Sequence, residues 1–398
     1  MTLPRTVWYF GLEPVASRYT AQLSGDSTSV GWMPKALDAA CMRAGLPDKT
    51  VQKLRPHITS LPADIITGKV LDAVGRGRYA LAQCDTFLSF IRDGLVRDGD
   101  VIFLQDFWTP GLEAILYALH LHGIQVRLYS MLHAQSVDEY DFTFPMRTWM
   151  RGIELGYYAA HSGIFVASWI HRQQLINAGF MGVPIHVVGL PFDREDVGAA
   201  IWKDGPMVVK RNVVVYSSRL DAEKQPEFMV AVARRFLAEN PHWHWHVTTS
   251  LPDLRGDVDG LAAIRKLQLE NPHFSVFVNL SKDSYYAHLA RAQIQFNCSL
   301  QDYVSWTLLE AVTAGCDVVY PYFRSFPEVL PGDRLYEPWK VEDAVRMLNI
   351  AAENPRTHIP IATLCDYGRR LTAEIVVNGA VKNFNQQDRF EVNIWKGE

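Results

Sequence analysis

Two stretches of the chain carry charged side chains whose spacing suits a ligand with phosphate and hydroxyl groups. Arg219 and Lys224 lie five positions apart, between the apolar run Val213–Val215 and an expected helix. Two cations and the free amides of such a strand-to-helix turn can converge on one anion. Asp302 and Glu310 lie eight positions apart around the start of a second expected helix. Carboxylates there can accept hydrogen bonds from sugar hydroxyls, while the helix amides bind phosphate.

Each stretch also has a simpler interpretation when it is taken alone. Arg219 and Lys224 would then be solvated loop cations, one of them paired with Glu223. Glu310 would be a surface acid on an ordinary capped amphipathic helix. The functional interpretation therefore depends on the two stretches occurring in one fold and in this order.

The elements that must position these residues alternate between short apolar runs and longer amphipathic stretches. Strands that are apolar on both faces and alternate with helices are typical of parallel sheets covered on both sides. The sequence therefore predicts an α/β protein with two doubly wound sheets of five strands each, rather than one barrel. The expected strands are Val7–Phe10, Val101–Leu104, Gln125–Ser130, Gly163–Ala167, Ile185–Val188, Val213–Ser217, His244–Thr248, Ser275–Val278, Ile294–Asn297 and Asp317–Tyr320. The expected helices include Gly111–His122, Gln173–Gly179, Glu227–Glu239, Ser284–Arg291 and Thr307–Ala314.

Length and composition agree with a folded protein of two domains. The chain has 398 residues, of which 48% are hydrophobic, so it is too long for one core and too apolar for disorder. Residues 1–190 carry 16 Lys and Arg against 16 Asp and Glu, so charge alone does not indicate a nucleic-acid binder. We see no signal peptide, no membrane span and, among five cysteines, no CxxC pair. A reduced, cytoplasmic protein is expected.

Taken together, the two charged stretches resemble the signature of the large retaining glycosyltransferase family of the GT-B type. That family has a turn of the form G-R-x-x-x-x-K-G, followed later by a helix of the form E-G-x-G-x-x-x-x-E. Arg219 and Lys224 match the two cations, with Gln225 where glycine is usual. Glu310 matches the second acid, and Asp302 matches the first with one methylene fewer.

The same segment also departs from the family pattern, because Tyr303 and Ser305 replace both of its glycines. Further agreement comes from the order of the surrounding pieces. Residues 160–195 and 281–335 resemble the family's remaining strands, its turn at the domain crossover and the loop Ser325–Val329. The resemblance covers about residues 160–335 well and the N-terminal third loosely.

The resemblance implies a GT-B fold, with two Rossmann-like domains facing a central cleft. Residues 1–192 would form the acceptor domain, with the tail 368–398 packed back on it. Residues 193–211 would be the linker about which the domains close, and 212–367 the nucleotide-sugar domain.

The resemblance also implies transfer of a hexosyl or pentosyl group from a nucleotide-sugar such as a UDP-sugar, with retention and without a metal or other cofactor. Arg219 and Lys224 would stabilise the leaving diphosphate, Asp302 would bind the sugar hydroxyls, and Glu310 would hold the ribose. His133 would lie beside the anomeric centre, although a purely structural histidine is an equal alternative. Further donor-binding residues would be Ser218, Tyr303, Val304, Ser305, Trp306 and Thr307.

The acceptor side is expected in the loops after the first strands. The block that contains Glu13, Ser17, Arg18 and Tyr19 resembles bacteriophage glycosyltransferases that decorate hydroxymethylated pyrimidines in DNA. Asp106 and Trp108 would point into the same cleft. The implied partner is modified duplex DNA, and a phage-encoded protein would act in the host cytoplasm. The alternatives are a saccharide or lipid acceptor, or an inactive scaffold that only binds nucleotide or nucleic acid.

Two other patterns suggest metal chemistry but have simpler interpretations. Asp257-Val258-Asp259 has a D-x-D form, yet it lies in a polar loop and is interpreted as a solvated turn. His242, His244 and His246 alternate with tryptophans, so we expect a strand that packs two tryptophans inward rather than a metal site.

Overall fold

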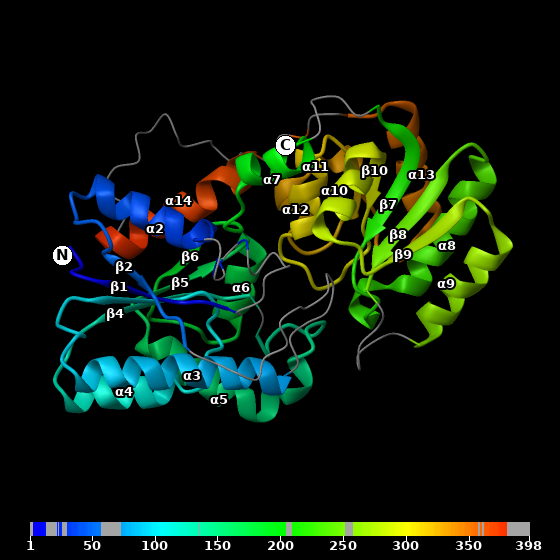
Figure 1. The fold of residues 1–398 in the computed structure, drawn as a ribbon. Helices are drawn as coiled ribbons and strands as arrows, with labels where there is room; N and C mark the ends of the chain where they lie inside the picture. The colour runs from blue at the N-terminus through cyan, green and yellow to red at the C-terminus, as the bar shows by residue number, and fades with distance from the viewer. Residues whose placement is uncertain are drawn as a thin grey trace, which may run out of the picture.

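The protein folds into two lobes, each built around one parallel sheet (Figure 1). A computed structural model describes residues 3–12, 22, 24–25, 30–56, 73–133, 135–203, 209–250, 258–356, 359 and 362–379. We call the lobe around β1–β6 the amino-terminal lobe and the lobe around β7–β12 the carboxyl-terminal lobe.

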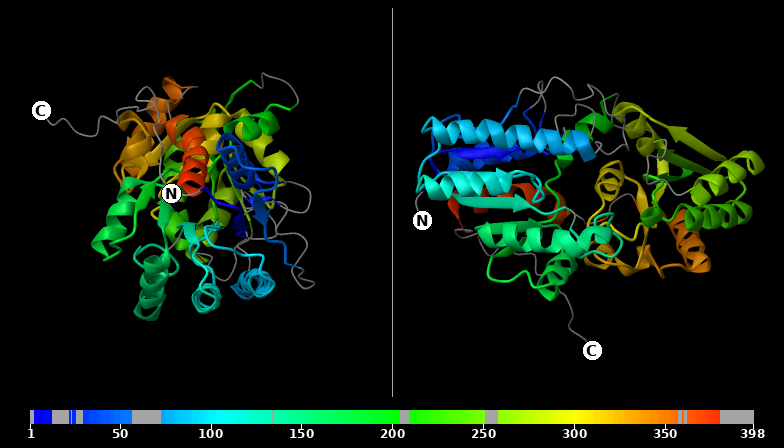
Figure 2. Two further views of the ribbon diagram at one scale, coloured as in Figure 1. Left: turned by 90° about the vertical axis from the view of Figure 1, so that its left-hand side faces the viewer. Right: turned by 90° about the horizontal axis from the view of Figure 1, so that it is seen from below.

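The amino-terminal lobe has six strands in the order β2-β1-β3-β4-β5-β6, all parallel. Its strands are β1 (Val7–Phe10), β2 (Val51–Lys53), β3 (Val101–Leu104), β4 (Arg127–Met131), β5 (Gly163–Val166) and β6 (Ile185–Val187). Helices α3 (Ala73–Arg92), α4 (Leu112–Leu121), α5 (Arg147–Ala160) and α6 (Trp169–Asn177) cover one face. Helices α2 (Trp32–Arg43) and α14 (Ala362–Asn378) cover the other. Seen from below, α3, α4 and α5 lie side by side under this sheet (Figure 2).

The carboxyl-terminal lobe has the strand order β12-β11-β10-β7-β8-β9. Its strands are β7 (Arg211–Ser217), β8 (His244–Thr249), β9 (Phe274–Val278), β10 (Ala292–Phe296), β11 (Asp317–Pro321) and β12 (Leu335–Tyr336). Helices α8 (Pro226–Glu239), α9 (Val258–Glu270) and α13 (Val341–Glu353) pack on one face. Helices α7 (Arg194–Ile201), α10 (Lys282–Arg291), α11 (Trp306–Thr313) and α12 (Phe326–Val329) pack on the other.

The residues of β7 show why both faces of the sheet are covered. Val213 and Val215 point into the core with α10 and α11, whereas Val214 and Tyr216 point into the core with α8 and α13. This alternation follows from the two-residue period of a strand, and every one of these four side chains is buried. A strand in this position must be apolar throughout, as the sequence predicts.

The strand order places a topological switch point between β7 and β10. From β7 the chain continues outward through β8 and β9, and it then returns to the other side of β7 as β10. The loops after β7 and β10 therefore diverge and leave a crevice at the carboxyl ends of these strands, where ligands of such sheets bind. Arg219 and Lys224 follow β7, and Asp302 follows β10, so the candidate residues lie at this point.

The predicted α/β class is confirmed, and all ten predicted strands are present within two residues of their expected ends. The prediction of five strands per sheet is wrong, because each sheet has a sixth strand at an edge. β2 is only Val51–Lys53 and is not fully buried, and β12 is only Leu335–Tyr336. Strands this short give no apolar run or alternation that sequence analysis can detect.

Chain segments near the predicted boundaries pack in specific places. Within the predicted linker, Arg194–Ile201 forms α7, whose start is capped by the Asp193 side chain and which contacts α10 and α11. Helix α14, near the end of the described chain, lies against α2 in the amino-terminal lobe (Figure 1). Cys41, Cys84, Cys298 and Cys316 are buried free thiols. No helix in the described part of the chain is long and apolar enough to cross a membrane.

Candidate active site

Lys224 and Asp302 form an ion pair at the switch point between β7 and β10. The Lys224 Nζ lies 2.8 Å from Asp302 Oδ1 and donates a hydrogen bond of 2.9 Å to Ser299 Oγ. The lysine side chain is 7% exposed, whereas the aspartate side chain is 24% exposed. In the described part of the chain, Asp302 is the carboxylate that ion-pairs with Lys224, and a nearly buried ammonium can attract a further anion. The structure thus brings together two residues that lie 78 positions apart in the sequence.

Arg219 lies beside this pair and is held by two carboxylates of its own loop. Its Nη1 is 2.7 Å from Asp221 Oδ2, and its Nη2 is 3.1 Å from Glu223 Oε1. Burial raises the pKa of Glu223, and the charges of Lys224 and Arg219 oppose that rise. Glu223 therefore lies within the field of both cations. Ser218, the neighbouring predicted donor residue, donates its backbone amide to Thr248 O at 3.3 Å.

Gln225 explains how the chain manages without the glycine that is usual at this turn. Its φ of 49° and ψ of 57° place it in the left-handed region, which glycine adopts without strain. The Gln225 side chain donates a 2.6 Å hydrogen bond to the carbonyl of Cys298 at the end of β10. This bond ties the turn after β7 to the strand beside it, and Pro226 then starts α8.

Glu310 lies in α11 and is almost completely buried. Its Oε1 forms an ion pair with Lys282 and accepts a 3.2 Å hydrogen bond from the Tyr286 hydroxyl. Lys282 is the first residue of α10 and Tyr286 lies one turn later, so α10 orients the carboxylate. Sequence analysis missed Lys282, although Ser281 caps this helix by accepting from Ser284 N, a signal that the S-x-x-S spacing contains.

The segment between Asp302 and α11 contacts the other lobe through Tyr303. The Tyr303 ring stacks on His171 of α6, with ring centroids 3.8 Å apart and an interplanar angle of 6°. Its hydroxyl accepts a 3.0 Å hydrogen bond from Gln135 Nε2 and donates one of 2.6 Å to Gln174 Oε1. The His171 Nε2 donates to Gln135 Oε1 at 2.9 Å, which completes a buried network. The side chain that replaces a family glycine thus binds the amino-terminal lobe.

The next four residues, 304–307, lead into α11 and form its first turn. Val304 is buried, and Ser305 precedes the helix, with its Oγ 2.8 Å from Thr307 Oγ1. Trp306 packs against Trp32 and Phe192, with ring centroids 6.1 and 5.8 Å away. Ser305 makes no side-chain cap to α11, so no serine oxygen occupies the amides at the helix start.

Further polar contacts cross between the lobes, among them those of Arg324, Glu328 and Gln301. Arg324 donates a 2.6 Å charge-assisted hydrogen bond to Asp138, and both side chains are buried. Burial raises the pKa of Asp138, and Arg324 lowers it. The two carboxylate oxygens of Glu328, in α12, accept hydrogen bonds of 2.8 Å from the backbone amides of Trp169 and Ile170. Glu328 therefore caps the start of α6. Gln301 donates to Asp141 at 3.0 Å. These contacts therefore join the two lobes beside the candidate site.

His133 and Asp106 lie at the carboxyl edge of the amino-terminal sheet. The His133 Nε2 donates to the Gln105 carbonyl at 2.9 Å, which leaves Nδ1 as an acceptor. Burial lowers the pKa of His133 to about 4, so the ring is neutral at pH 7. Asp106 forms an ion pair with Arg76 of α3, a residue that sequence analysis missed.

Other predicted residues fall elsewhere. Trp108 packs against Trp149 and Tyr157 of α5, with ring centroids 6.4 and 6.0 Å away. Glu13, Ser17, Arg18 and Tyr19 lie outside the described residues, as does Asp257 of the D-x-D pattern. Trp243 and Trp245 are buried as expected. Within the described ranges, no three His, Cys, Asp or Glu side chains are grouped so as to hold a metal ion.

Comparisons with known proteins identify the fold. No protein-family model and no curated protein sequence matches the chain. Sucrose-phosphate synthase from Thermosynechococcus elongatus aligns over 96% of both chains, with a TM-score of 0.60 and 12% sequence identity. A UDP-forming α,α-trehalose-phosphate synthase from Burkholderia xenovorans covers 95% of this chain and 96% of its own, with a TM-score of 0.59 and 12% identity. TarM from S. aureus, solved with UDP, covers 75% of this chain and 55% of its own, with a TM-score of 0.50 and 13% identity. Together with the two six-stranded parallel sheets, these similarities show that the chain has the GT-B fold.

Proposed function

We propose that the protein is a glycosyltransferase that uses a nucleotide-sugar donor. The observation that carries this proposal is the Lys224–Asp302 pair at the β7/β10 switch point, with Arg219 in the same loop. The fold supports it, since sucrose-phosphate synthase and the UDP-forming trehalose-phosphate synthase share it. The nucleotide-sugar has three parts, a diphosphate, a ribose and a sugar, and the candidate site offers a residue of suitable charge or polarity for each of them.

The roles follow from the charges. As the glycosidic bond breaks, negative charge grows on the leaving diphosphate, and pre-positioned cations stabilise it. Lys224 and Arg219 supply two positive charges, and the uncapped amides of α11 supply further donors. Glu310, which is buried and oriented by Lys282, would accept hydrogen bonds from the ribose hydroxyls. Asp302, the exposed member of its pair, would bind the transferred sugar.

We further propose that the sugar is transferred with retention, by front-face attack of the acceptor hydroxyl within an ion pair. The support is the resemblance of the Arg219–Lys224 and Asp302–Glu310 segments to the retaining family. The neutral His133 suits this role, because its free Nδ1 can accept a hydrogen bond but adds no positive charge beside the oxocarbenium ion. Proton NMR coupling at the anomeric carbon of the product would distinguish retention from inversion.

For the acceptor we propose a hydroxymethylated pyrimidine in DNA, on the strength of the block Glu13–Thr20 and the Trp32–Pro34 segment in the sequence. The competing acceptor is a saccharide, since the two synthases named above form phosphorylated disaccharides, sucrose phosphate and trehalose phosphate.

The test is nucleotide release from a panel of UDP-, GDP- and ADP-sugars, with and without DNA that contains hydroxymethylcytosine or hydroxymethyluracil. Release stimulated by modified DNA, but not by plain DNA or simple sugars, would support both enzyme class and acceptor. Release that only sugars or sugar phosphates stimulate would support the class and overturn the DNA acceptor. If no nucleotide is released from any of the donors, the proposal that the protein is an enzyme is wrong, and a scaffold that binds nucleotide is favoured.

A further inference from the structure

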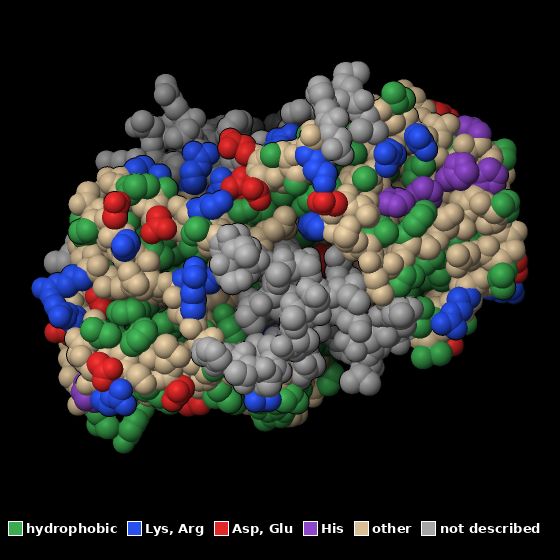
Figure 3. All heavy atoms as spheres, in the orientation of Figure 1, with side chains coloured by type: hydrophobic (Ala, Val, Ile, Leu, Met, Phe, Trp, Pro, Cys, Tyr) green, Lys and Arg blue, Asp and Glu red, His purple; other side chains and the backbone are tan. Residues whose placement is uncertain are grey.

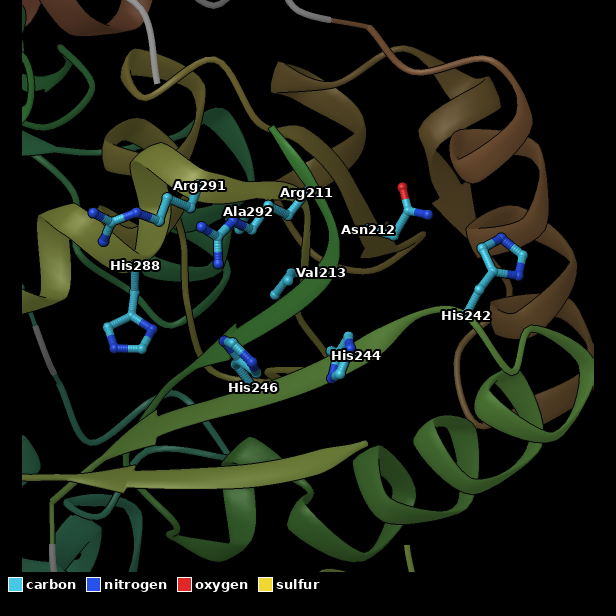
Figure 4. A pocket seen from close by; sticks show the side chains of 9 residues that line it. All are labelled: Arg211, Asn212, Val213, His242, His244, His246, His288, Arg291 and Ala292. Carbon is cyan, nitrogen blue, oxygen red and sulfur yellow. The ribbon is translucent and has the colours of Figure 1, made fainter. Parts of the chain in front are cut away.

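A second concave site lies at the opposite edge of the carboxyl-terminal sheet. A groove of about 680 Å³ opens where β7, β8 and β10 begin, next to the end of α10 (Figure 4). β7 is seven residues long, so the groove and the candidate active site lie about 20 Å apart along the strand. The groove exists because α10 covers β7 and β10 but leaves the start of β8 open, where His244 is exposed and His246 is half-buried.

The side chains around the groove are cationic or can become so. Arg211 begins β7, Arg291 ends α10, and the imidazoles of His242, His244, His246 and His288 line the same hollow. The histidines form a row across this face of the lobe, with Lys or Arg side chains beside it (Figure 3). The residues that line the groove, all within the described part of the chain, include no Asp or Glu.

None of these groups is neutralised by the described residues. Neither Arg211 nor Arg291 has a carboxylate among the residues that line the groove, and Arg211 lies opposite the apolar Ala292 in the sheet. The imidazoles contact one another instead. The His246 ring lies 5.6 Å from His288, and the His244 ring lies 4.6 Å from His273. Gathering cationic groups without a counter-charge is unfavourable, and such a cluster raises the local concentration of anions.

We propose that this groove is a binding site for a phosphate-bearing anion, separate from the candidate active site. The guanidinium groups of Arg211 and Arg291 would bind phosphate oxygens with their paired N–H donors. His246 and His288 would contribute further N–H donors from the floor of the groove. A volume of about 680 Å³ exceeds one phosphate and suits a nucleotide-sized ligand or a short length of phosphodiester backbone. The inference does not depend on the glycosyltransferase proposal.

Binding at this site should be coupled to protonation. Burial, together with the neighbouring His288 and His244, lowers the pKa of His246 to about 4. Burial and Arg291 lower the pKa of His288. Among the described residues, the charged or titratable groups around these rings are Arg211 from β7, His242 and His244 at the start of β8, and Arg291 from α10, with His273 against His244. All are basic, so a bound anion favours the protonated rings and binds more tightly as the pH falls.

The test follows the ring signals of His246 and His288 by NMR in the full chain, assigned with His246→Asn and His288→Asn. Inorganic pyrophosphate and a single-stranded oligonucleotide are titrated separately at pH 6 and pH 8. Because the readout is the groove itself, binding of pyrophosphate at the active site does not mimic it. We expect both ring signals to shift, their titration midpoints to rise, and the affinity to be higher at pH 6.

Arg211→Gln combined with Arg291→Gln should weaken this binding at least tenfold. Arg265→Gln, an exposed arginine of α9, is the matched control and should leave it unchanged. If the oligonucleotide binds more tightly than pyrophosphate, the ligand is a phosphodiester backbone. If pyrophosphate binds more tightly, the ligand is a small phosphate ester. Ring signals that neither probe moves, or a double variant that binds as the wild type does, would overturn the proposal.

Discussion

The aromatic ring of Tyr303, in the carboxyl-terminal lobe, stacks directly on the imidazole of His171 in the amino-terminal lobe, with centroids 3.8 Å apart. Tyr303 directly follows Asp302, which pairs with Lys224. The contact between the lobes and the candidate site therefore share one loop. A change in how the lobes contact each other through Tyr303 would therefore move Asp302.

Two replacements of Tyr303 should separate what its ring stacking and its hydrogen bonds each contribute to the free energy of unfolding. Tyr303→Phe keeps the stack but leaves Gln135 and Gln174 without the hydroxyl, which should cost about 1–3 kcal/mol of the free energy of unfolding. Tyr303→Gly removes the ring as well and should cost about 3–5 kcal/mol. Urea denaturation measures both. A glycine variant as stable as the wild type would show that the stack contributes nothing to closure.

The buried His171 should make stability depend on pH. Burial lowers its pKa to about 3, whereas an imidazole in the unfolded chain takes up a proton near pH 6.5. Protonation therefore stabilises the unfolded state, and the stability present above pH 6.5 is lost as the pH falls toward 3. The slope for one proton is about 1.4 kcal/mol per pH unit.

His171→Phe keeps a ring against Tyr303 but cannot titrate, so its free energy of unfolding should fall less steeply between pH 6.5 and 4. The exposed His120 of α4 provides the control, since His120→Gln leaves the buried imidazole in place. Thermal denaturation across this pH range measures the slopes. Equal slopes for His171→Phe and the wild type would contradict the prediction.

The buried Arg324–Asp138 pair should be strongly coupled. Removing Arg324 leaves the Asp138 charge buried without this partner, and removing Asp138 leaves Arg324 only its 3.6 Å contact with the exposed Glu139. Arg324→Met and Asp138→Leu should therefore each cost about 3–5 kcal/mol of unfolding free energy. The double variant should be more stable than the sum of the two losses predicts, because it buries no isolated charge. A double-mutant cycle by chemical denaturation measures this coupling. Strict additivity would show that the two side chains do not interact energetically.

Glu310 should determine recognition of the ribose. Glu310→Gln keeps the shape of the side chain but removes its charge and the ion pair with Lys282. We expect KM for the nucleotide-sugar to rise about tenfold with a smaller change in kcat. The wild type should discriminate against the 2′-deoxy donor, and the variant should discriminate less. If both proteins treat the two donors alike, Glu310 does not contact the ribose.

Much of the fold was predictable because the buried strands have a clear signal. β7 is apolar where it contacts both helical layers, whereas β10 turns Ile294 and Phe296 to one layer and carries the buried Gln295 between them. The charged residues that follow these two strands meet at the switch point. The pairing of Lys224 with Asp302 follows from this topology. The sequence also indicated that Trp243, just before β8, and Trp245 of β8 face inward, and their burial confirms it.

The contacts between lobes were not predictable, because they depend on how two separate sheets are placed in space. His171 lies 132 positions before Tyr303, and nothing in the local pattern of either segment indicates the stack. Arg324 and Asp138 are similarly distant, and each has an ordinary loop context. The groove at the start of β8 was missed for another reason. It depends on which part of a sheet face a helix leaves uncovered.

The most direct test of the glycosyltransferase proposal compares nucleotide release by the wild type, Lys224→Met and Arg219→Met. Lys266→Met is the control, since this exposed lysine of α9 lies near Glu270 of the same helix. If the two cations stabilise the leaving diphosphate, kcat should fall about 100- to 1,000-fold in both site variants and remain unchanged in the control. Release by the site variants at the wild-type rate, with the fold intact, would contradict the assignment of this site as the centre of sugar transfer.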